Sequence, residues 1–407
     1  MKCRHCFANL EHTFLDLGFA PPSNAYLTQA DLVRPEKYYP LKIMVCSDCC
    51  LVQTIDYAQA DELFSADYAY FSSTSTSWLA HAAQYAEKMT RELGLGKHSY
   101  VIEVASNDGY LLKNFVAAGI PCLGIEPTAS TAAAAEALGI KVMRKFFGEA
   151  LGHRLAAEGC QADLIAGNNV YAHVPDINDF TRGLKAALKP GGTITLEFPH
   201  LMCLLEHTQF DTVYHEHFSY LSLYTVNRIF KAASLRVWNV EELPTHGGSL
   251  RIYGCHAEEA RETAPAVRAM LADEARRGLQ TLATYHNFQA KADRVKDDLL
   301  AFLIEQKRVG KTVAAYGAAA KGNTLLNYAG VKPDLLSFVC DAAFAKQGKF
   351  MPGSHIPILA PETLGGQRPD YLVILPWNIA AEVKQQNARL AKLGTKFVTA
   401  VPKLKVT

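Results

Sequence analysis

The string Tyr214-His215-Glu216-His217 places four proton-exchanging side chains next to one another. Two imidazoles two residues apart on a strand would face one side and could bind a metal, but the chain has no His-Glu-x-x-His spacing. A histidine among aromatic residues is by default a hydrogen-bonded core residue. A histidine oriented by a neighbouring carboxylate is instead a general base near neutral pH, able to take a proton from carbon. The string by itself leaves the structural and catalytic interpretations about equally open.

Two Cys-x-x-Cys pairs, Cys3/Cys6 and Cys46/Cys49, open the chain. Four thiolates in two close pairs are the ligand set of tetrahedral zinc, with Zn–S distances of about 2.3 Å. A redox-active dithiol would need only one pair, and the remaining Cys50 is interpreted as a packing residue. Because protein ligands would fill all four positions, the predicted zinc stabilises structure and activates no water.

A turn from Glu103 to Gly109 follows a predicted strand and precedes a predicted helix. Such a turn lets the backbone approach a ligand and directs its amides at it. Glu126, at the end of the next predicted strand, could accept both hydroxyls of a ribose. Because no Gly-x-Gly-x-x-Gly occurs here, the turn favours a nucleoside cofactor of the S-adenosyl-L-methionine (Ado-Met) type over a dinucleotide. The residues predicted to bind it are Glu103, Ala105, Asn107, Gly109, Glu126, Phe147 and Asn168.

A second strand–turn–helix pattern carries Lys321, followed by Gly322 and Asn323. A lysine beside a glycine at a helix start suits a diphosphate, because the ammonium and the backbone amides both face the anion. A solvated lysine near a turn is the equally open alternative. Lys321 and Asn323 are the predicted contacts to a substrate nucleotide.

Composition argues against several function classes. The 407 residues are 49% hydrophobic and 20% charged, which is ordinary for a globular protein of two or three domains. A net charge of +1 argues against nucleic-acid binding. No run approaches the roughly 20 apolar residues that span a bilayer, and the first residues lack the apolar core of a signal peptide. We therefore expect a cytoplasmic protein that binds neither nucleic acid nor membrane.

The pattern of apolar runs predicts an α/β protein in several parts. We expect a zinc-binding domain over 1–60, an aromatic covering segment and helix over 61–85, a core over 86–245 and a C-terminal α/β domain over 246–407. Strands alternating with helices in the core predict a parallel sheet wound on both faces. The stretch from 256 to 309 is predicted to be helical, with its first helix starting near Pro265 because proline is tolerated in a first turn.

Taken together, these motifs resemble the nucleotide-sugar C-methyltransferases, Ado-Met-dependent enzymes that make branched deoxysugars. The resemblance runs nearly end to end, and its most specific part is the string from Gln209 to Tyr220; it also covers the Cys pairs, 103–109, 171–176 and 246–251. It implies a class I methyltransferase core of Rossmann-like fold, an N-terminal zinc domain, and a C-terminal α/β domain that helps to hold the nucleotide sugar. One departure is Ala105, where the family usually has glycine.

The resemblance also implies roles for the titratable residues. His217 matches the base, with Tyr214 and Glu216 beside it, and His173 and Tyr68 match the polar groups around the sugar. The implied reaction removes a proton next to a 4-keto group, and the resulting enolate takes the methyl group. The alternatives are an O- or N-methyltransferase acting on a sugar or another small molecule, an RNA-binding zinc-ribbon methyltransferase, and a non-catalytic nucleotide-sugar binding protein. The expected partner is a dTDP- or GDP-linked sugar, and the protein is expected to be a monomer or a small homo-oligomer.

Overall fold

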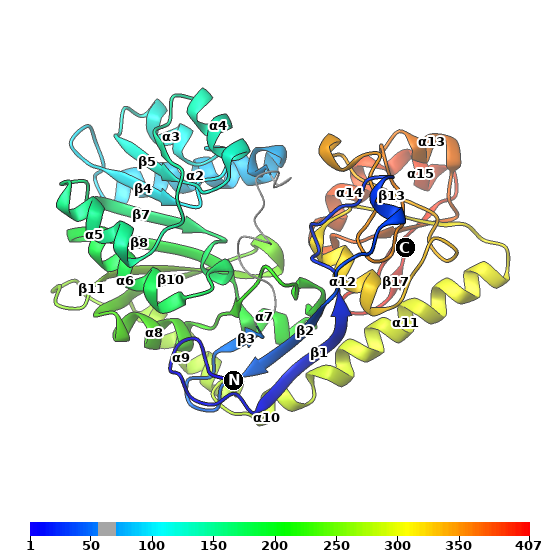
Figure 1. The fold of residues 1–407 in the computed structure, drawn as a ribbon, viewed down its shortest axis with the longest axis horizontal. Helices are drawn as coiled ribbons and strands as arrows, with labels where there is room; N and C mark the ends of the chain where they lie inside the picture. The colour runs from blue at the N-terminus through cyan, green and yellow to red at the C-terminus, as the bar shows by residue number, and fades with distance from the viewer. Residues whose placement is uncertain (56–70) are drawn as a thin grey trace.

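The structure is a computed structural model that describes residues 1–55 and 71–407. Two α/β units lie side by side, and the N-terminal strands and one long helix join them along one edge (Figure 1). Among the described residues, no helix is both long enough and apolar enough to cross a bilayer.

The N-terminal part forms a four-stranded antiparallel sheet in the order β1-β2-β3-β9. Its first three strands are β1 (His12–Ala20), β2 (Tyr39–Val45) and β3 (Val52–Thr54), and a 3-10 turn (Asp31–Val33) lies between β1 and β2. The fourth strand, β9 (Ser219–Tyr220), comes from the end of the titratable string, with Val52 opposite Tyr220. The cysteine-bearing domain therefore pairs directly with the segment that carries His217.

The core is a seven-stranded sheet in the order β10-β11-β8-β7-β4-β5-β6. Its strands are β4 (Val101–Val104), β5 (Cys122–Ile125), β6 (Val142–Met143), β7 (Ala162–Asn168), β8 (Leu188–Pro199), β10 (Leu235–Leu243) and β11 (Ser249–His256). Strand β11 runs antiparallel to both neighbours, whereas the pairs from β8 to β6 are parallel. Because β11 lies inside this sheet, between β10 and β8, the core continues past residue 245, where the sequence placed its end.

Helices cover the core, and polar caps fix where several of them start. Their bounds are α2 (Thr76–Glu92), α3 (Leu112–Ala117), α4 (Ala129–Ala137), α5 (Glu149–Ala157), α6 (Ile177–Ala187), α7 (Leu201–Glu206) and α8 (Leu223–Ala232), with 3-10 turns at Ser72–Thr74, Tyr171–His173, Phe210–Thr212 and Thr245–Gly247. Ser75 accepts a hydrogen bond from the amide of Trp78, and Asp176 caps α6 in the same way through Asn178 and Asp179.

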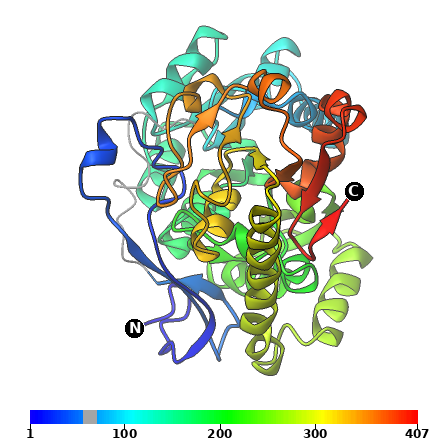
Figure 2. The ribbon, with the colours of Figure 1, turned by 90° about the vertical axis from the view of Figure 1, so that its right-hand side faces the viewer.

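A helical connection leads to the C-terminal unit. Helix α9 (Pro265–Arg276) begins at the predicted proline, and α10 (Ala283–His286) and the long α11 (Phe288–Arg308) follow. Helix α11 runs from the base of the N-terminal sheet to the C-terminal unit (Figure 2).

The C-terminal unit is a six-stranded sheet in the order β14-β13-β12-β15-β16-β17, and β17 is antiparallel to β16. Its elements are β12 (Val313–Tyr316), α12 (Ala320–Tyr328), β13 (Val339–Cys340), a 3-10 turn (Phe344–Lys346), β14 (Ile358–Leu359), α13 (Thr363–Gln367), β15 (Tyr371–Ile374), a 3-10 turn (Trp377–Ile379), α14 (Ala380–Gln386), α15 (Ala388–Lys392), β16 (Lys396–Thr399) and β17 (Lys405–Val406). The predicted second α/β unit is therefore present.

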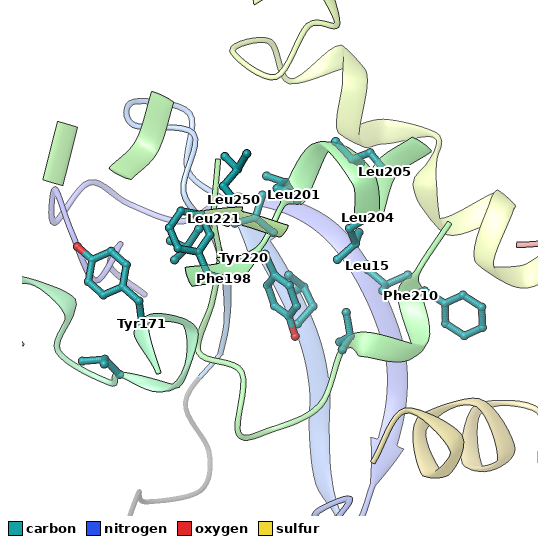
Figure 3. Packing of buried hydrophobic residues seen from close by; sticks show 14 of the residues in the cluster. Leu15, Tyr171, Phe198, Leu201, Leu204, Leu205, Phe210, Tyr220, Leu221 and Leu250 are labelled. Carbon is teal, nitrogen blue, oxygen red and sulfur yellow. The ribbon is translucent and has the colours of Figure 1, made fainter. Parts of the chain in front are cut away.

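One buried cluster joins the parts. Leu15 of β1, Leu204 of α7, Phe210 and Tyr220 pack in a single apolar cluster, and each is at most 6% exposed (Figure 3). Burying a large apolar side chain is worth about 1.5–3 kcal/mol, so these contacts fix the segment between Phe210 and Tyr220 on both sides.

Candidate active site

The four predicted zinc ligands come together. The sulfur atoms of Cys3, Cys6, Cys46 and Cys49 all lie within 4.8 Å of one another, with two of the pairs at 3.5 Å. Tetrahedral zinc with Zn–S distances of about 2.3 Å needs sulfur atoms about 3.8 Å apart, so the set fits this ion. Both hairpins have the same form: the residue after the second cysteine, Phe7 or Cys50, has a φ near +60° and its amide donates to the first cysteine's carbonyl. Cys50 therefore forms the turn beside the ligands, rather than being only a packing residue.

The predicted cofactor turn joins β4 to α3 at the carboxyl ends of the parallel strands. Ala105, Asn107 and Gly109 all have a positive φ, of 57°, 49° and 78°. A Cβ on Gly109 would lie 2.4 Å from a side-chain carbon of Ile140, so both the dihedral and the space require glycine. The left-handed φ at Ala105 explains why a glycine would be favoured there too.

Acidic side chains surround this turn. Glu126 is 5% exposed, and its two oxygens accept the amides of Asn107 (3.0 Å) and Thr128 (2.9 Å). Glu103 is fully buried in β4, and burial raises its pKa, with the neighbouring Glu126 and Asp108 raising it further. Each Glu126 oxygen keeps a second lone pair, so the carboxylate can still accept a ribose hydroxyl.

The remaining predicted cofactor residues lie at different distances from the turn. Asn168, at the end of β7, donates to the hydroxyl of Tyr110 next to Gly109, at 3.4 Å. Phe147 is half-buried, and its ring packs edge-on against Phe180 of α6, 5.3 Å between centroids. Phe147 thus contacts α6, and its contact with a cofactor remains a prediction.

The described end of the predicted covering segment does lie on the cofactor turn. The amide of Ser72 donates to Asn107 at 2.9 Å, and the amide of Ser73 donates to Asp108 at 3.0 Å. Tyr68, predicted to line the sugar site, lies outside the described residues.

His217 is the centre of the titratable cluster. Its Nδ1 lies 2.8 Å from the carbonyl oxygen of Thr212, so the proton sits on Nδ1 and the lone pair on Nε2. Among the described residues, no group hydrogen-bonds Nε2. The rings of Tyr214 and His173 lie 3.9 and 4.6 Å from the His217 ring, between centroids.

Burial keeps these imidazoles neutral. The pKa of His217 is held well below its usual range by burial, then by His173, with His246 and Lys321 adding to the effect. Burial lowers the pKa of His173 to about 4.

Glu216 is not the hydrogen-bond partner of His217 Nδ1, because the Thr212 carbonyl accepts that proton; that it orients or tunes the base stays a prediction. The Glu216 oxygens instead accept hydrogen bonds from Nδ2 of Asn24, at 2.9 and 2.8 Å. An uncharged carbonyl is therefore what fixes the tautomer of His217.

The sequence suggested Asn169, beside Asn168, as a possible neighbour of the cofactor, but it gave no role to His246. The Nδ2 of Asn169 lies 2.9 Å from Nε2 of His246, both residues have a φ of 54°, and the His246 ring packs edge-on against Trp78. Left-handed non-glycine residues gather at functional sites. The sequence signal for this position is the His246-Gly247-Gly248 run between two strands. The structure shows why a glycine is needed there: a Cβ on Gly247 would lie 2.4 Å from the Trp377 side chain. These residues connect the cofactor side with the His217 side.

Lys321 is the second residue of α12, directly after the β12–α12 turn. Its Nζ contacts Asn378 at 2.8 Å and lies 4.7 Å from the centre of the Trp377 ring. Asp211 is fully buried, accepts a hydrogen bond from Trp377 Nε1 at 2.7 Å, and has its pKa raised to about 6 by burial.

Asn323, the other predicted nucleotide contact, is fully buried and donates to the carbonyl of Ser23 at 2.6 Å, so its amide group is engaged by the N-terminal segment.

Comparisons with known proteins agree with this arrangement. Residues 3–64 match the family described as a zinc binding domain, residues 77–240 a methyltransferase domain, and residues 244–402 the C-methyltransferase C-terminal domain. The sheet order and the acidic turn define a class I, Ado-Met-dependent methyltransferase that carries a structural zinc site.

A relative covers the whole chain. C-methyltransferase NovU of Streptomyces niveus is 33% identical over 405 residues, which span 100% of this chain and 96% of the relative. The chain therefore belongs to the C-methyltransferase family.

Solved structures align with less than half of the chain. The YcgJ protein of Bacillus subtilis covers 44% of it at 12% identity and a TM-score of 0.35, with all of that chain aligned. Magnesium protoporphyrin IX methyltransferase of Synechocystis covers 43% at 12% identity and a TM-score of 0.34, with 82% of that chain aligned.

Proposed function

We propose that the protein methylates a carbon next to the 4-keto group of a dTDP- or GDP-linked deoxysugar. One observation carries this proposal. Within residues 1–55 and 71–407, nothing hydrogen-bonds the Nε2 lone pair of His217, and its imidazole feels the charges of both His246 and Lys321.

The position of the base suits carbon better than oxygen or nitrogen. A saturated sugar carbon becomes a nucleophile only after it loses a proton next to a ketone. When bound, Ado-Met supplies the electrophilic methyl group. His217 Nε2 takes the α-proton, and its lowered pKa keeps it in the accepting form. The negative charge developing on the enolate offsets the cost of forming a buried imidazolium.

The other site residues stabilise and orient the sugar in this proposal. Tyr214, His173 and Tyr68 donate to the enolate oxygen, and one such donor is typically worth about 2.7–4 kcal/mol. Lys321 holds the nucleotide diphosphate. Alignment of carbon, methyl and sulfur contributes about 7–11 kcal/mol.

The test is incubation with Ado-Met and a panel of 4-keto nucleotide sugars, with products identified by mass and NMR. We expect a new C–C bond; an O- or N-methyl product would contradict the proposal. Solvent deuterium should enter the sugar at the same carbon without Ado-Met.

His217→Asn should lower turnover by about 10²–10⁴-fold and abolish deuterium entry, with Ado-Met affinity unchanged. His215→Gln is the matched control, because that imidazole faces the carbonyl of Tyr39 at 3.3 Å and this variant should keep near-normal turnover.

The low pKa of His217 predicts that turnover is constant from neutral pH down to below 6.5, and falls only where the imidazole takes a proton.

A further inference from the structure

An N-terminal arm, residues 21–38, leaves the zinc-domain sheet after β1 and returns to it in β2. Between these strands it lies against the C-terminal unit (Figures 1 and 2). Leu27 and Phe350 form a β-bridge, and Glu36 accepts hydrogen bonds from the amide of Gly353 and the ring of His355. The arm thus connects the zinc domain to the unit that carries Lys321.

The first part of the arm contacts the chain on both sides of Lys321, at the β12–α12 turn and in the first residues of α12. The hydroxyl of Tyr26 donates to the carbonyl of Ala318 at 2.5 Å. The side-chain amide of Asn323 donates to the carbonyl of Ser23 at 2.6 Å. In the next turn of α12, Thr324 donates to the carbonyl of Val213, one residue before the titratable string, at 2.7 Å.

Asn24 lies between these two attachments and reaches the catalytic string itself. Its Nδ2 lies within 2.9 Å of both oxygens of Glu216, which is 2% exposed. An amide NH₂ can only donate, so this contact favours the ionised carboxylate and fixes its direction. Losing this donor would remove one of the contacts that fix the direction of this buried carboxylate.

We propose that Asn24 is a positioning residue that holds the Glu216 carboxylate in register with His217. This inference rests on the proposed function. The arm makes the catalytic string dependent on the turn that carries Lys321, because one short segment contacts both.

Kinetics of the full-length, zinc-loaded protein test this inference. Asn24→Ala should lower kcat for the 4-keto nucleotide sugar about 10- to 100-fold, the range expected when a charged group loses a hydrogen bond, with the Kd for Ado-Met unchanged. In a Glu216→Ala background, which has no side-chain acceptor, the same substitution should lower kcat by less than about twofold, because the contact is already lost. A merely structural role for Asn24 would give independent, multiplicative losses.

Glu36→Gln is the matched control. It weakens the arm at its other end, where it contacts Gly353 and His355, and should leave kcat near the wild-type value. An equal loss in Glu36→Gln would mean that arm attachment in general matters, and would overturn the specific role of Asn24. A wild-type kcat in Asn24→Ala would overturn it too. Failure of the wild-type protein to methylate any sugar of the panel would instead overturn the proposed function, on which this inference depends.

Discussion

The turn between β4 and α3 and the turn between β12 and α12 share one construction. Each follows a buried parallel strand, and the acid at the end of the neighbouring strand accepts an amide of the turn. Glu126 accepts from Asn107 at 3.0 Å in the core, and Asp341 accepts from Ala318 at 2.7 Å in the C-terminal unit. In each case the other carboxylate oxygen accepts the amide of the residue two positions after the acid, Thr128 or Ala343.

The two turns differ in charge and in what lies over them. Asp108 and Glu126 lie at the core turn beside Glu103, whose pKa is raised by burial and by these two neighbours, and acidic groups suit a cationic sulfonium. The C-terminal turn carries Lys321, which suits an anionic diphosphate. Residues 72–73 lie on the first turn, and the N-terminal arm lies on the second. The same backbone arrangement is thus combined with different side chains in the two turns, and the proposed function assigns them ligands of opposite charge.

The largest expected effect comes from removing a zinc ligand. Cys46→Ser should release the arm from its folded base, because structural zinc contributes about 10–16 kcal/mol of apparent binding free energy in small zinc domains. We expect turnover to fall at least about 100-fold while the core turn still binds Ado-Met. Zinc analysis and calorimetric titration with Ado-Met check this, with Cys160→Ser as the control. Equal loss of Ado-Met binding would contradict the separation of the two turns.

Replacing Lys321 should affect only the anionic ligand. Lys321→Met should raise the Kd for the nucleotide sugar about 10- to 100-fold, because a charged donor to the phosphates is lost. Binding measured over a range of salt concentrations should show a smaller salt dependence than the wild type. Lys403→Met, at an exposed position, is the control. If the Kd for Ado-Met changes as much as that for the sugar, the charge difference between the turns does not determine their ligands.

Replacing Glu126 and replacing Asp341 should each weaken the binding of a different ligand. Glu126→Gln should raise the Kd for Ado-Met about tenfold, since an amide offers one acceptor oxygen in place of two. Asp341→Asn should leave that Kd unchanged and weaken nucleotide-sugar binding instead. Titrating each variant with each ligand gives four values, and any other pattern would show that the turns are not equivalent constructions.

The smallest effect concerns backbone strain in the core turn. Ala105→Gly should raise the free energy of unfolding by about 1 kcal/mol, because the φ of 57° disfavours a Cβ. Ala83→Gly, at an exposed position inside α2, should lower it by about the same amount. Denaturant midpoints distinguish these opposite signs, and a loss in both variants would mean that Ala105 is not strained.

Much of the fold follows from local sequence. The predicted alternation of strands and helices in the core is present, and helix α9 starts at Pro265, because apolar runs and proline act locally. The four zinc ligands are likewise evident from Cys-x-x-Cys spacing alone.

Contacts between distant segments could not be predicted in this way. Nothing near Glu216 indicates that Asn24, 192 residues earlier, is its partner. The carbonyl of Thr212 carries no side-chain signature, so its hold on His217 was also unpredictable. Strand β9 has two residues, too short to show any periodicity.

The pairing of β3 with β9 has a consequence for exchanging parts between relatives. Val52 and Gln53 stand opposite Tyr220 and Ser219, so the metal-bearing module supplies a strand partner two residues from His217. A chimaera that takes the first 55 residues from another family member would also import a new neighbour for the reacting centre. Recombination should preserve activity only when both halves of this strand pair come from the same parent.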